Sequence, residues 1–362
     1  MTLHQLPAPG LEGVPAALTA LSHVDGEAGE LIIAGSRVGD LAAETDFEGL
    51  AARLWSAAHG RPVAEADARA WIASARQRAF GRLPALLPVT RGMTPVEGLR
   101  AMIAALAPSP ELPVEAALSG AVPVFAAALV RQANGAAPVA PDPALGLAAD
   151  TLRMMRGARA TAAEAKALDA YLVTVSDHGM NASTFAARVV ASTRADMVMA
   201  VTAAYCGLTG PLHGGAPGPV LDMLDDIGTR DRIGPWIASA LARGERLMGF
   251  GHRIYKVRDP RADVLRAALA TLEGRGGDLG FAAEVEAAAR AALQAAKPDR
   301  PLDTNVEFYT AILLDALAIP REAFTPVFAI GRTLGWTAHA IEQQRTGKLL
   351  RPSSIYTGPM PQ

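Results

Sequence analysis

The chain has 362 residues, half of them hydrophobic, and a formal net charge of −2. This length predicts about two domains, with ample apolar material for a large core, and the charge balance gives no electrostatic footprint for nucleic acid. The single cysteine, Cys206, excludes an intrachain disulfide and a cysteine-based zinc cluster. Such scarce cysteine fits a reducing compartment.

No targeting or membrane segment is expected. The first ten residues lack a basic run followed by an apolar core, which a signal peptide would have. The longest apolar region, residues 116–130, is short and is interrupted by Ser119, Gly120 and Pro123. We therefore expect a cytoplasmic protein without membrane contact.

Alanine-rich stretches between prolines and glycines predict mostly helices. Thr94-Pro95 is typical of a helix start, with a capping side chain followed by proline at the first helical position. Residues 31–33 give the clearest strand signal, and residues 273–280 read as a turn between helices. The predicted fold is all-α, with helices at residues 122–132, at 145–170 (one or two), and at 181–205, 262–272, 281–296, 306–317 and 327–344.

Three of the seven histidines lie in clusters rich in glycine and charge. His178 is in Asp-His-Gly-Met-Asn-Ala-Ser-Thr, His213 in Gly-Pro-Leu-His-Gly-Gly, and His252 in Gly-Phe-Gly-His-Arg. Neighbouring glycines let a ligand approach the backbone, and histidine exchanges protons near neutral pH. These residues are therefore candidates for acid–base chemistry, although each alone is typical of a turn, and three histidines can also hold zinc.

Arginine and glutamate give a second signal. Arg261 follows Asp259-Pro260, Arg332 lies in an otherwise apolar helix, and Arg351 precedes a proline near the C-terminus. Arginine suits bidentate binding of carboxylates, although a surface salt bridge is the ordinary alternative for any one of them. Glu307 lies near the start of an apolar-faced helix, where the helix N-terminus favours a carboxylate and where an ordinary first-turn glutamate would also lie.

These motifs, taken in order from residue 10 to residue 352, resemble those of citrate synthase over almost the whole chain. The resemblance implies an all-α fold with a large domain (residues 1–214 and 316–362) and an inserted small domain (residues 215–315) that closes over the substrate. It further implies a homodimer of the compact type that uses oxaloacetate and an acyl-CoA, acetyl-CoA above all, and no further cofactor.

Site residues follow from the matched motifs. His213 corresponds to the histidine that stabilises the enol of the acyl-CoA, and His252 to the one that polarises and protonates the oxaloacetate carbonyl. Glu307, after Asn305-Val306, occupies the position of the general base. The remaining matches are oxaloacetate ligands His178, Arg261, Arg332 and Arg351 (the last from the partner subunit), the CoA-binding residue Lys256, and the supporting residues Ser183 and Asn305.

Three positions depart from the family pattern. Glu307 replaces aspartate, Pro217 replaces the asparagine of Gly-Gly-Ala-Asn, and Ala34-Gly35-Ser36 replaces Arg-Gly-Tyr. A glutamate moves its carboxylate by roughly 1 Å, and a displacement of that size can lower a rate about 100-fold. The sequence thus predicts citrate formation and leaves open 2-methylcitrate formation from propionyl-CoA, or a weakly active or inactive paralogue that binds oxaloacetate or CoA or pairs with an active homologue.

Overall fold

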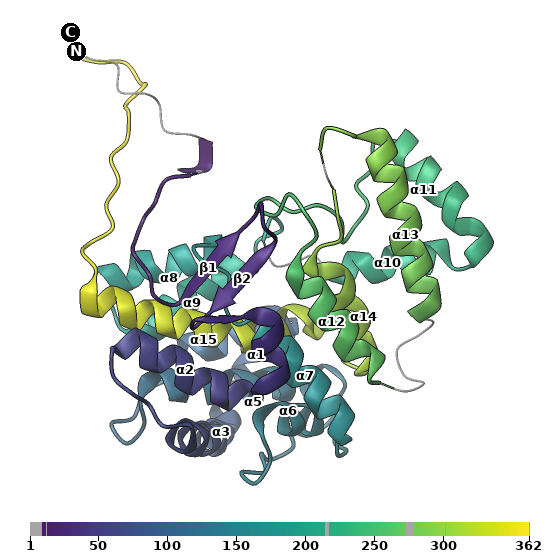
Figure 1. Ribbon diagram of the computed structural model, residues 1–362. Helices are drawn as coiled ribbons and strands as arrows, with labels where there is room; N and C mark the ends of the chain where they lie inside the picture. Colours follow the sequence, from purple (N-terminus) through teal and green to yellow (C-terminus); the bar gives the residue numbers. More distant parts are fainter. Residues whose placement is uncertain (1–8, 12, 214–216, 273–278, 301, 362) are drawn as a thin grey trace.

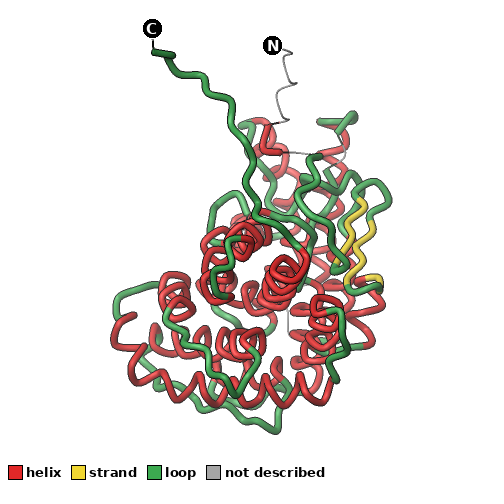
Figure 2. Tube along the Cα trace, turned by 90° about the vertical axis from the view of Figure 1, so that its left-hand side faces the viewer, coloured by secondary structure: helices red, strands yellow, loops and turns green. Residues whose placement is uncertain are grey.

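The computed structural model describes all residues except 1–8, 12, 214–216, 273–278, 301 and 362, and it is built almost entirely of helices (Figures 1 and 2). A small antiparallel sheet in the order β1-β2-β3 is formed by β1 (Ser22–Asp25), β2 (Glu30–Ile33) and β3 (Ser36–Arg37). The all-α prediction is confirmed, and the strand predicted at residues 31–33 is the middle strand of this sheet.

The helices are α1 (Val38–Glu44), α2 (Phe47–His59), α3 (Glu65–Leu86), α4 (Pro95–Ala104), α5 (Val114–Ala133), α6 (Leu147–Arg156), α7 (Ala162–Thr174), α8 (Ala182–Ser192), α9 (Met197–Leu208), α10 (Pro217–Ile227), α11 (Ile233–Ala242), α12 (Pro260–Ala270), α13 (Leu279–Ala296), α14 (Val306–Ala316) and α15 (Phe324–Thr346).

Two helices, α5 and α15, form the centre of the core. Residues 118–130 of α5 and 326–343 of α15 are all buried, and in α15 these include the charged and polar residues Arg332, His339 and Glu342. α5 packs against α3, α4, α6 and α15, and α15 also contacts α2, α7, α8 and α9. The long apolar face of α15 therefore joins the helices that will carry the site.

Helix α5 is longer than predicted. It begins at Val114, not at residue 122, and passes through Gly120 and Pro123 without ending. Among the described residues it is the one helix long and apolar enough to cross a membrane, but 83% of its most apolar stretch of 18 residues is buried inside the protein. Such burial is typical of the core helix of a globular protein.

Most of the other predicted helices are confirmed, with one clear error. Residues 145–170 form two helices, α6 and α7, and the Thr94-Pro95 start of α4 has the full capping box with Glu97. The single helix predicted at residues 181–205 is wrong, because the chain turns between α8 and α9. Arg194 has a positive φ of 68°, and the Asp196 side chain caps α9 by accepting a hydrogen bond from the Met199 amide.

The last five helices before α15 lie together on one side of the molecule, with α10, α11 and α13 outermost (Figure 1). α12 packs against α14, α7 and α1, and so connects this group to the rest of the chain. The division into domains at residues 215 and 315 stays a prediction. The turn predicted at residues 273–280 lies largely outside the described residues, and α13 begins at Leu279.

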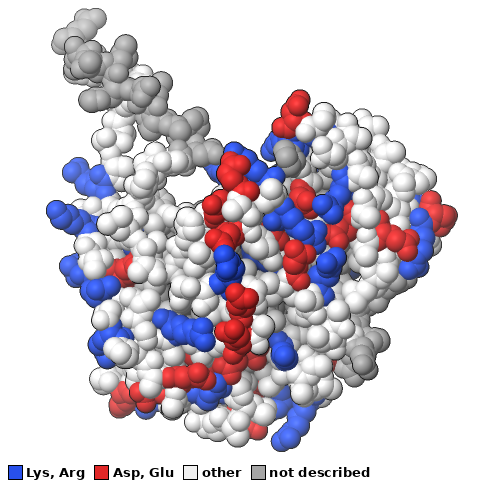
Figure 3. Space-filling view, in the orientation of Figure 1, with Lys and Arg blue, Asp and Glu red and all other residues white. Residues whose placement is uncertain are grey.

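On the face seen in Figure 3, acidic side chains run down the middle, basic side chains are scattered along the left edge, and both signs are mixed on the right. This distribution agrees with the small net charge of −2. It offers no continuous basic stripe on that face for a nucleic acid backbone.

Candidate active site

His252 lies in a loop that residues 303–305 hold in place. The Gly251 amide donates to the Asp303 carbonyl (2.7 Å), the Asn305 amide donates to the Gly249 carbonyl (2.9 Å), and the Asn305 side-chain amide donates to the Gly251 carbonyl (2.8 Å). Gly249 and Gly251 have positive φ values of 83° and 81°, a conformation that glycine adopts without strain. The glycines of Gly-Phe-Gly-His therefore shape the loop that presents the histidine.

The same loop fixes which nitrogen of His252 carries a proton. Its Nδ1 atom accepts hydrogen bonds from the backbone amides of Ile254 (3.0 Å) and Tyr255 (3.1 Å). An imidazole nitrogen that accepts cannot also carry a hydrogen, so these two short contacts favour the tautomer of neutral His252 with its proton on Nε2. In that tautomer Arg261 NH2, which lies 3.4 Å from Nε2 and can only donate, makes no hydrogen bond to it. The ring thus presents an N–H donor at Nε2.

His213 is fixed through its opposite nitrogen. Its Nε2 atom lies 2.8 Å from the Ser183 hydroxyl oxygen and accepts from the Ser183 backbone amide at 3.3 Å. The Trp336 indole N–H donates to the same hydroxyl oxygen at 3.1 Å, and the hydroxyl lies 2.8 Å from Asn181 Oδ1. The Ser183 backbone amide can only donate, so Nε2 accepts and neutral His213 has its proton on Nδ1. The single hydroxyl proton of Ser183 then serves either Nε2 or Asn181 Oδ1, and not both at once.

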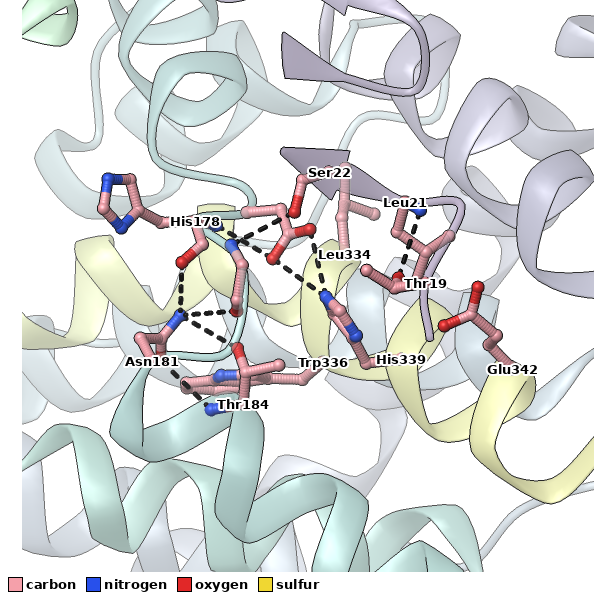
Figure 4. Close-up of polar contacts among 12 residues, drawn as sticks. Thr19, Leu21, Ser22, His178, Asn181, Thr184, Leu334, Trp336, His339 and Glu342 are labelled. Carbon is pink, nitrogen blue, oxygen red and sulfur yellow. Dashed lines mark hydrogen bonds and ion pairs between the residues drawn. The ribbon is translucent and has the colours of Figure 1, made fainter. Parts of the chain in front are cut away.

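Asn181 is the residue that joins Ser183 to the His178 segment. It caps α8 by accepting from the Thr184 amide at 3.1 Å, and its amide nitrogen donates to the Thr184 hydroxyl at 2.9 Å. Figure 4 shows Asn181 beneath the turn that carries His178, with the histidine ring pointing away from these contacts. The order of the motif, His-Gly-Met-Asn-Ala-Ser-Thr, thus builds one turn and one helix start.

His178 packs against the His252 loop. Its ring centroid lies 5.5 Å from those of His252 and Tyr255, and its Nε2 atom lies 3.1 Å from the Tyr255 hydroxyl. The backbone before it is anchored by Asp177, whose carboxylate lies 3.1 Å from His339 Nε2 on α15 (Figure 4). Two of the three predicted histidines therefore share an aromatic cluster, and Tyr255 is its third member.

The two buried arginines of the predicted site, Arg261 and Arg332, differ in how their charge is balanced. Arg261 is neutralised by Asp259, which accepts from its Nε at 3.0 Å and from its NH2 at 2.8 Å. Arg332 is 2% exposed, donates from Nε to the Val175 carbonyl at 2.7 Å, and lies over the Phe328 ring. Among the described residues, Arg332 forms no ion pair, and its NH1 has no hydrogen-bond partner.

Burial lowers the pKa of Arg332 to about 10, with Arg261 adding to the effect and Asp177 opposing it. A buried guanidinium with an open N–H and an unbalanced charge is a site for an anion. The surface salt bridge considered for this residue is therefore wrong. For Arg261 the partner is a buried carboxylate beside His252, not a surface group.

Glu307 is the second residue of α14. Its backbone amide donates to the Asn305 side-chain oxygen at 2.9 Å, so Asn305 both caps α14 and holds the His252 loop. The Glu307 Oε2 atom is buried and has no hydrogen-bond partner among the described residues. Burial raises the pKa of Glu307 to about 7, with Asp259 adding to the effect and Arg261 opposing it.

The histidines are shifted in the other direction. Burial lowers the pKa of His213 to about 4, assisted by Arg332, and lowers that of His252 to about 4, assisted by Arg261. His178 also has a pKa well below its ordinary value, chiefly because of burial and then of Arg261. At neutral pH these three imidazoles are therefore neutral, while the pKa of the Glu307 carboxyl lies at about 7.

Two predicted residues lie apart from this cluster. Lys256 is exposed and its ammonium pairs with Glu27, in the turn between β1 and β2. Its backbone amide donates to the Gly26 carbonyl at 2.9 Å, so this turn packs directly on the His252 loop. Arg351 is exposed in the segment after α15, which extends away from the helices (Figures 1 and 2).

The three departures from the family pattern fall in different surroundings. Ala34 and Gly35 form the turn between β2 and β3, both with positive φ (48° and 82°), and Gly35 suits this turn better than Ala34 does. Pro217 is the first residue of α10, and its side chain lies outside the described residues. Glu307 alone of the three lies among the described site residues.

Four supporting residues were missed from the sequence: Asn181, Tyr255, Asp259 and Trp336. Two of them carried a signal, because Asp259-Pro260 is typical of a helix start and Asn181 is the first residue of a predicted helix, where capping side chains are common. Tyr255 and Trp336 carried none, since their roles depend on contacts with His178 and Ser183, which are distant in sequence.

The arrangement combines a carboxylate that can accept a proton, two imidazole N–H donors that face different directions, and a buried cation with an open N–H. Donors of this kind stabilise the negative charge of an enolate or of a carbonyl oxygen under attack. The sequence model described as "Citrate synthase, C-terminal domain" matches residues 10–353. The chain belongs to the citrate synthase family.

Individual relatives agree with this assignment. The citrate synthase of Haloferax volcanii is 36% identical over 96% of this chain and 95% of its own. A protein named putative citrate synthase 2 in Mycobacterium tuberculosis is 50% identical over 196 residues, and this match spans only about half of either chain (54% and 52%).

Solved structures show the same fold. The citrate synthase of Thermotoga maritima has a TM-score of 0.85 and 31% identity, with 97% of this chain and 96% of its own covered. The Thermoplasma acidophilum enzyme, solved as a ternary complex with carboxymethyl coenzyme A and oxaloacetate, has a TM-score of 0.86 and 28% identity, with 98% and 97% covered. The predicted family and fold are therefore confirmed.

Proposed function

We propose that this protein condenses acetyl-CoA with oxaloacetate to form citrate and CoA. The observation that carries the proposal is a buried carboxylate, Glu307, on the helix start that Asn305 joins to the His252 loop, together with two neutral histidines held by opposite ring nitrogens. An acyl methyl group is a weak acid, so its deprotonation needs both a base and a donor to the developing enolate oxygen.

Each group then has a defined step. Glu307 removes a proton from the acyl methyl group, and His213 Nδ1–H donates to the thioester oxygen as negative charge develops there. The enol carbon attacks the keto carbon of oxaloacetate while His252 Nε2–H donates to, and then protonates, the keto oxygen. Water hydrolyses the resulting citryl thioester, which yields citrate and CoA.

Oxaloacetate is a dianion and needs fixed cations. Arg332, with its open N–H, and Arg261, beside His252, bind its carboxylates in this proposal, and His178 adds a hydrogen bond. Arg351 completes the set from the partner subunit, since in its own chain it lies in an exposed segment. Lys256 contacts the phosphates of CoA once its exposed pair with Glu27 opens.

A homodimer agrees with the apolar side chains exposed near both ends of the chain. Leu18 is 94% exposed and Tyr356 68% exposed, and in this proposal the partner subunit covers them. We propose that the segment after α15 lies on a second copy of the chain. No cofactor beyond the substrates is required in this proposal, so extensive dialysis against a chelator should leave the activity unchanged.

The direct test is release of free thiol from acetyl-CoA in the presence of oxaloacetate, with propionyl-CoA in a parallel assay. We expect thiol release that depends on oxaloacetate, faster with acetyl-CoA. Both substrates are assayed because one extra methyl group changes the discrimination between acyl-CoA substrates by only about 1–3 kcal/mol. A preference for propionyl-CoA would identify a 2-methylcitrate synthase. No release from either substrate by folded dimeric protein would overturn the enzyme proposal.

Glu307→Asp tests how far the site has adapted to its longer side chain. We expect a fall in kcat, because the shorter carboxylate would withdraw from the acyl methyl group by roughly 1 Å. Glu307→Gln is the matched control, since it keeps the length and removes the base. A large rise with aspartate would mean that the glutamate impairs this scaffold.

A further inference from the structure

A small, partly open space lies beside Glu307, bordered by residues of α7, α14 and α15 and by Val175 at the end of α7. It leaves about 10 Å³ for the centre of a water-sized sphere, which is the room that one water molecule needs. It is lined by Tyr171, Val175, Val306, Glu307, Thr310 and Phe328. The space is therefore large enough for one water and too small for a second.

Two buried polar atoms belong to side chains that line this space, and neither has a partner among the described residues. One is the hydroxyl of Tyr171, a residue that is 0% exposed, and the other is Glu307 Oε2. An unpaired buried hydroxyl or carboxylate oxygen is destabilising, and native proteins satisfy nearly all such groups. A single water between them would satisfy both.

A methyl group of a larger acyl substrate is the other occupant to consider. Its apolar surface would suit Val175 and Phe328, but it would leave both oxygens without a hydrogen bond. The two polar atoms therefore favour water over an apolar group.

We propose that Tyr171 is a positioning residue for the general base, holding the Glu307 carboxylate through one bound water. This inference rests on the proposed condensation. It gives a physical role to the extra methylene of glutamate, because the longer side chain can reach the water on one side while its other oxygen faces the substrate. Electrostatics agree with close approach, since the charge of Glu307, after burial, contributes to raising the pKa of the Tyr171 hydroxyl.

The charged and titratable groups around this pair come from three elements. Asp259 and Arg261, at the start of α12, shift the pKa of Glu307, and Arg332 of α15 acts on Tyr171. His252 lies beside Arg261. Because none of these groups changes in a tyrosine variant, a shift of the pH profile reports the hydroxyl and its water.

The test is Tyr171→Phe, which removes only the hydroxyl. Without it the water loses a partner and the carboxylate is less stabilised, so kcat/KM at pH 7 should fall about 3- to 10-fold. The acidic limb of the pH profile should move to higher pH, and the affinity for oxaloacetate should not change. Tyr205→Phe is the matched control, because Tyr205 is equally buried but its hydroxyl donates to the Val96 carbonyl at 2.9 Å, away from the site.

A double variant separates positioning from a structural effect. In the Glu307→Asp background the shorter carboxylate no longer reaches the water, so Tyr171→Phe should have little further effect on kcat. Equal effects in both backgrounds, or an unmoved acidic limb, would overturn the proposal.

A crystal structure of the wild-type protein gives a readout that does not depend on activity. It should show one ordered water within hydrogen-bond distance of both the Tyr171 hydroxyl and Glu307 Oε2. A space filled by side chains, or a propionyl methyl group bound there in a complex, would contradict the inference. Absence of thiol release by the wild type, with the water present, would instead overturn the proposed condensation alone.

Discussion

The His213 and His252 rings are each held by hydrogen bonds to one ring nitrogen, but the groups that hold them come from different parts of the chain. His252 is held by the backbone of its own loop, through the amides of Ile254 and Tyr255. His213 is held by Ser183, a residue 30 positions earlier, which Trp336 and Asn181 hold in turn. One ring is left with a donor at Nε2 and the other with a donor at Nδ1.

This difference shows how one residue type provides two distinct donors. A neutral imidazole has one N–H, and whichever nitrogen accepts a structural hydrogen bond leaves the other as donor. Low pKa values, near 4 for both rings, keep them neutral. The site can therefore donate a hydrogen bond to two different carbonyl oxygens without carrying two imidazolium charges.

The largest effect is expected on removal of either ring. His213→Ala and His252→Ala should each lower kcat about 100- to 1,000-fold, the range measured for loss of one donor to a developing oxyanion. They should differ in binding, because only His252→Ala is expected to weaken oxaloacetate. Steady-state kinetics and calorimetric titration with oxaloacetate measure both, and an equal loss of oxaloacetate affinity would remove the distinction.

Removing the support of each ring should have a smaller effect. Ser183→Ala should lower kcat about 10- to 100-fold, because His213 loses the hydroxyl that orients it and the Trp336 indole N–H loses its acceptor, while Asn181 Oδ1 keeps the Thr184 amide. Gly251→Ala is the counterpart for His252, since its φ is +81° and an added Cβ would lie 2.8 Å from Leu302.

The two support variants should also differ in stability. Gly251→Ala should lower the free energy of unfolding by about 1–3 kcal/mol through backbone strain, as denaturant titration would show. Full activity of Ser183→Ala would mean that the backbone amide alone fixes His213.

Between pH 5 and 7 the pH dependence of kcat/KM should show the ionisation of Glu307 alone, and not that of His213 or His252. Glu307 must be ionised to accept a proton, and its pKa is raised to about 7, so kcat/KM should fall about tenfold per pH unit below pH 7. Both histidines are already neutral above about pH 5 and should add no limb there. A second acidic limb between pH 5 and 7, retained in Glu307→Asp, would show that one histidine is charged in the free enzyme.

The smallest effect is expected for Trp336→Phe. This change removes the N–H that donates to the Ser183 hydroxyl and keeps an aromatic ring in the core. We expect a fall in kcat of about 2- to 5-fold, because Ser183 keeps its contact with Asn181. The affinity for oxaloacetate, measured in the same experiments, should be unchanged. A loss of kcat as large as that of Ser183→Ala would mean that Trp336 is as important as Ser183 for orienting His213.

Much of the fold followed from local signals in the sequence. The helix start at Thr94-Pro95 was predicted correctly because capping depends on neighbouring residues, whereas α12 begins at Pro260, two residues before its predicted start. The break between α8 and α9 was missed because it depends on a positive φ at Arg194. Glycine is the usual sign of a positive φ, and no glycine is found at this turn. The start of α5 was missed because burial between α3 and α15 stabilises a helix through Gly120 and Pro123.

The sequence by itself determined the family, the helical architecture and the residue types of the site, because motifs and hydrophobic spacing are local properties of the chain. The tertiary structure decided how those residues act. It shows which nitrogen of each histidine is free, that Asp259 balances Arg261 while Arg332 has no described ion-pair partner, and that Tyr171 and Glu307 line one small space. These properties depend on burial and on contacts between residues far apart in the chain, which no local pattern records.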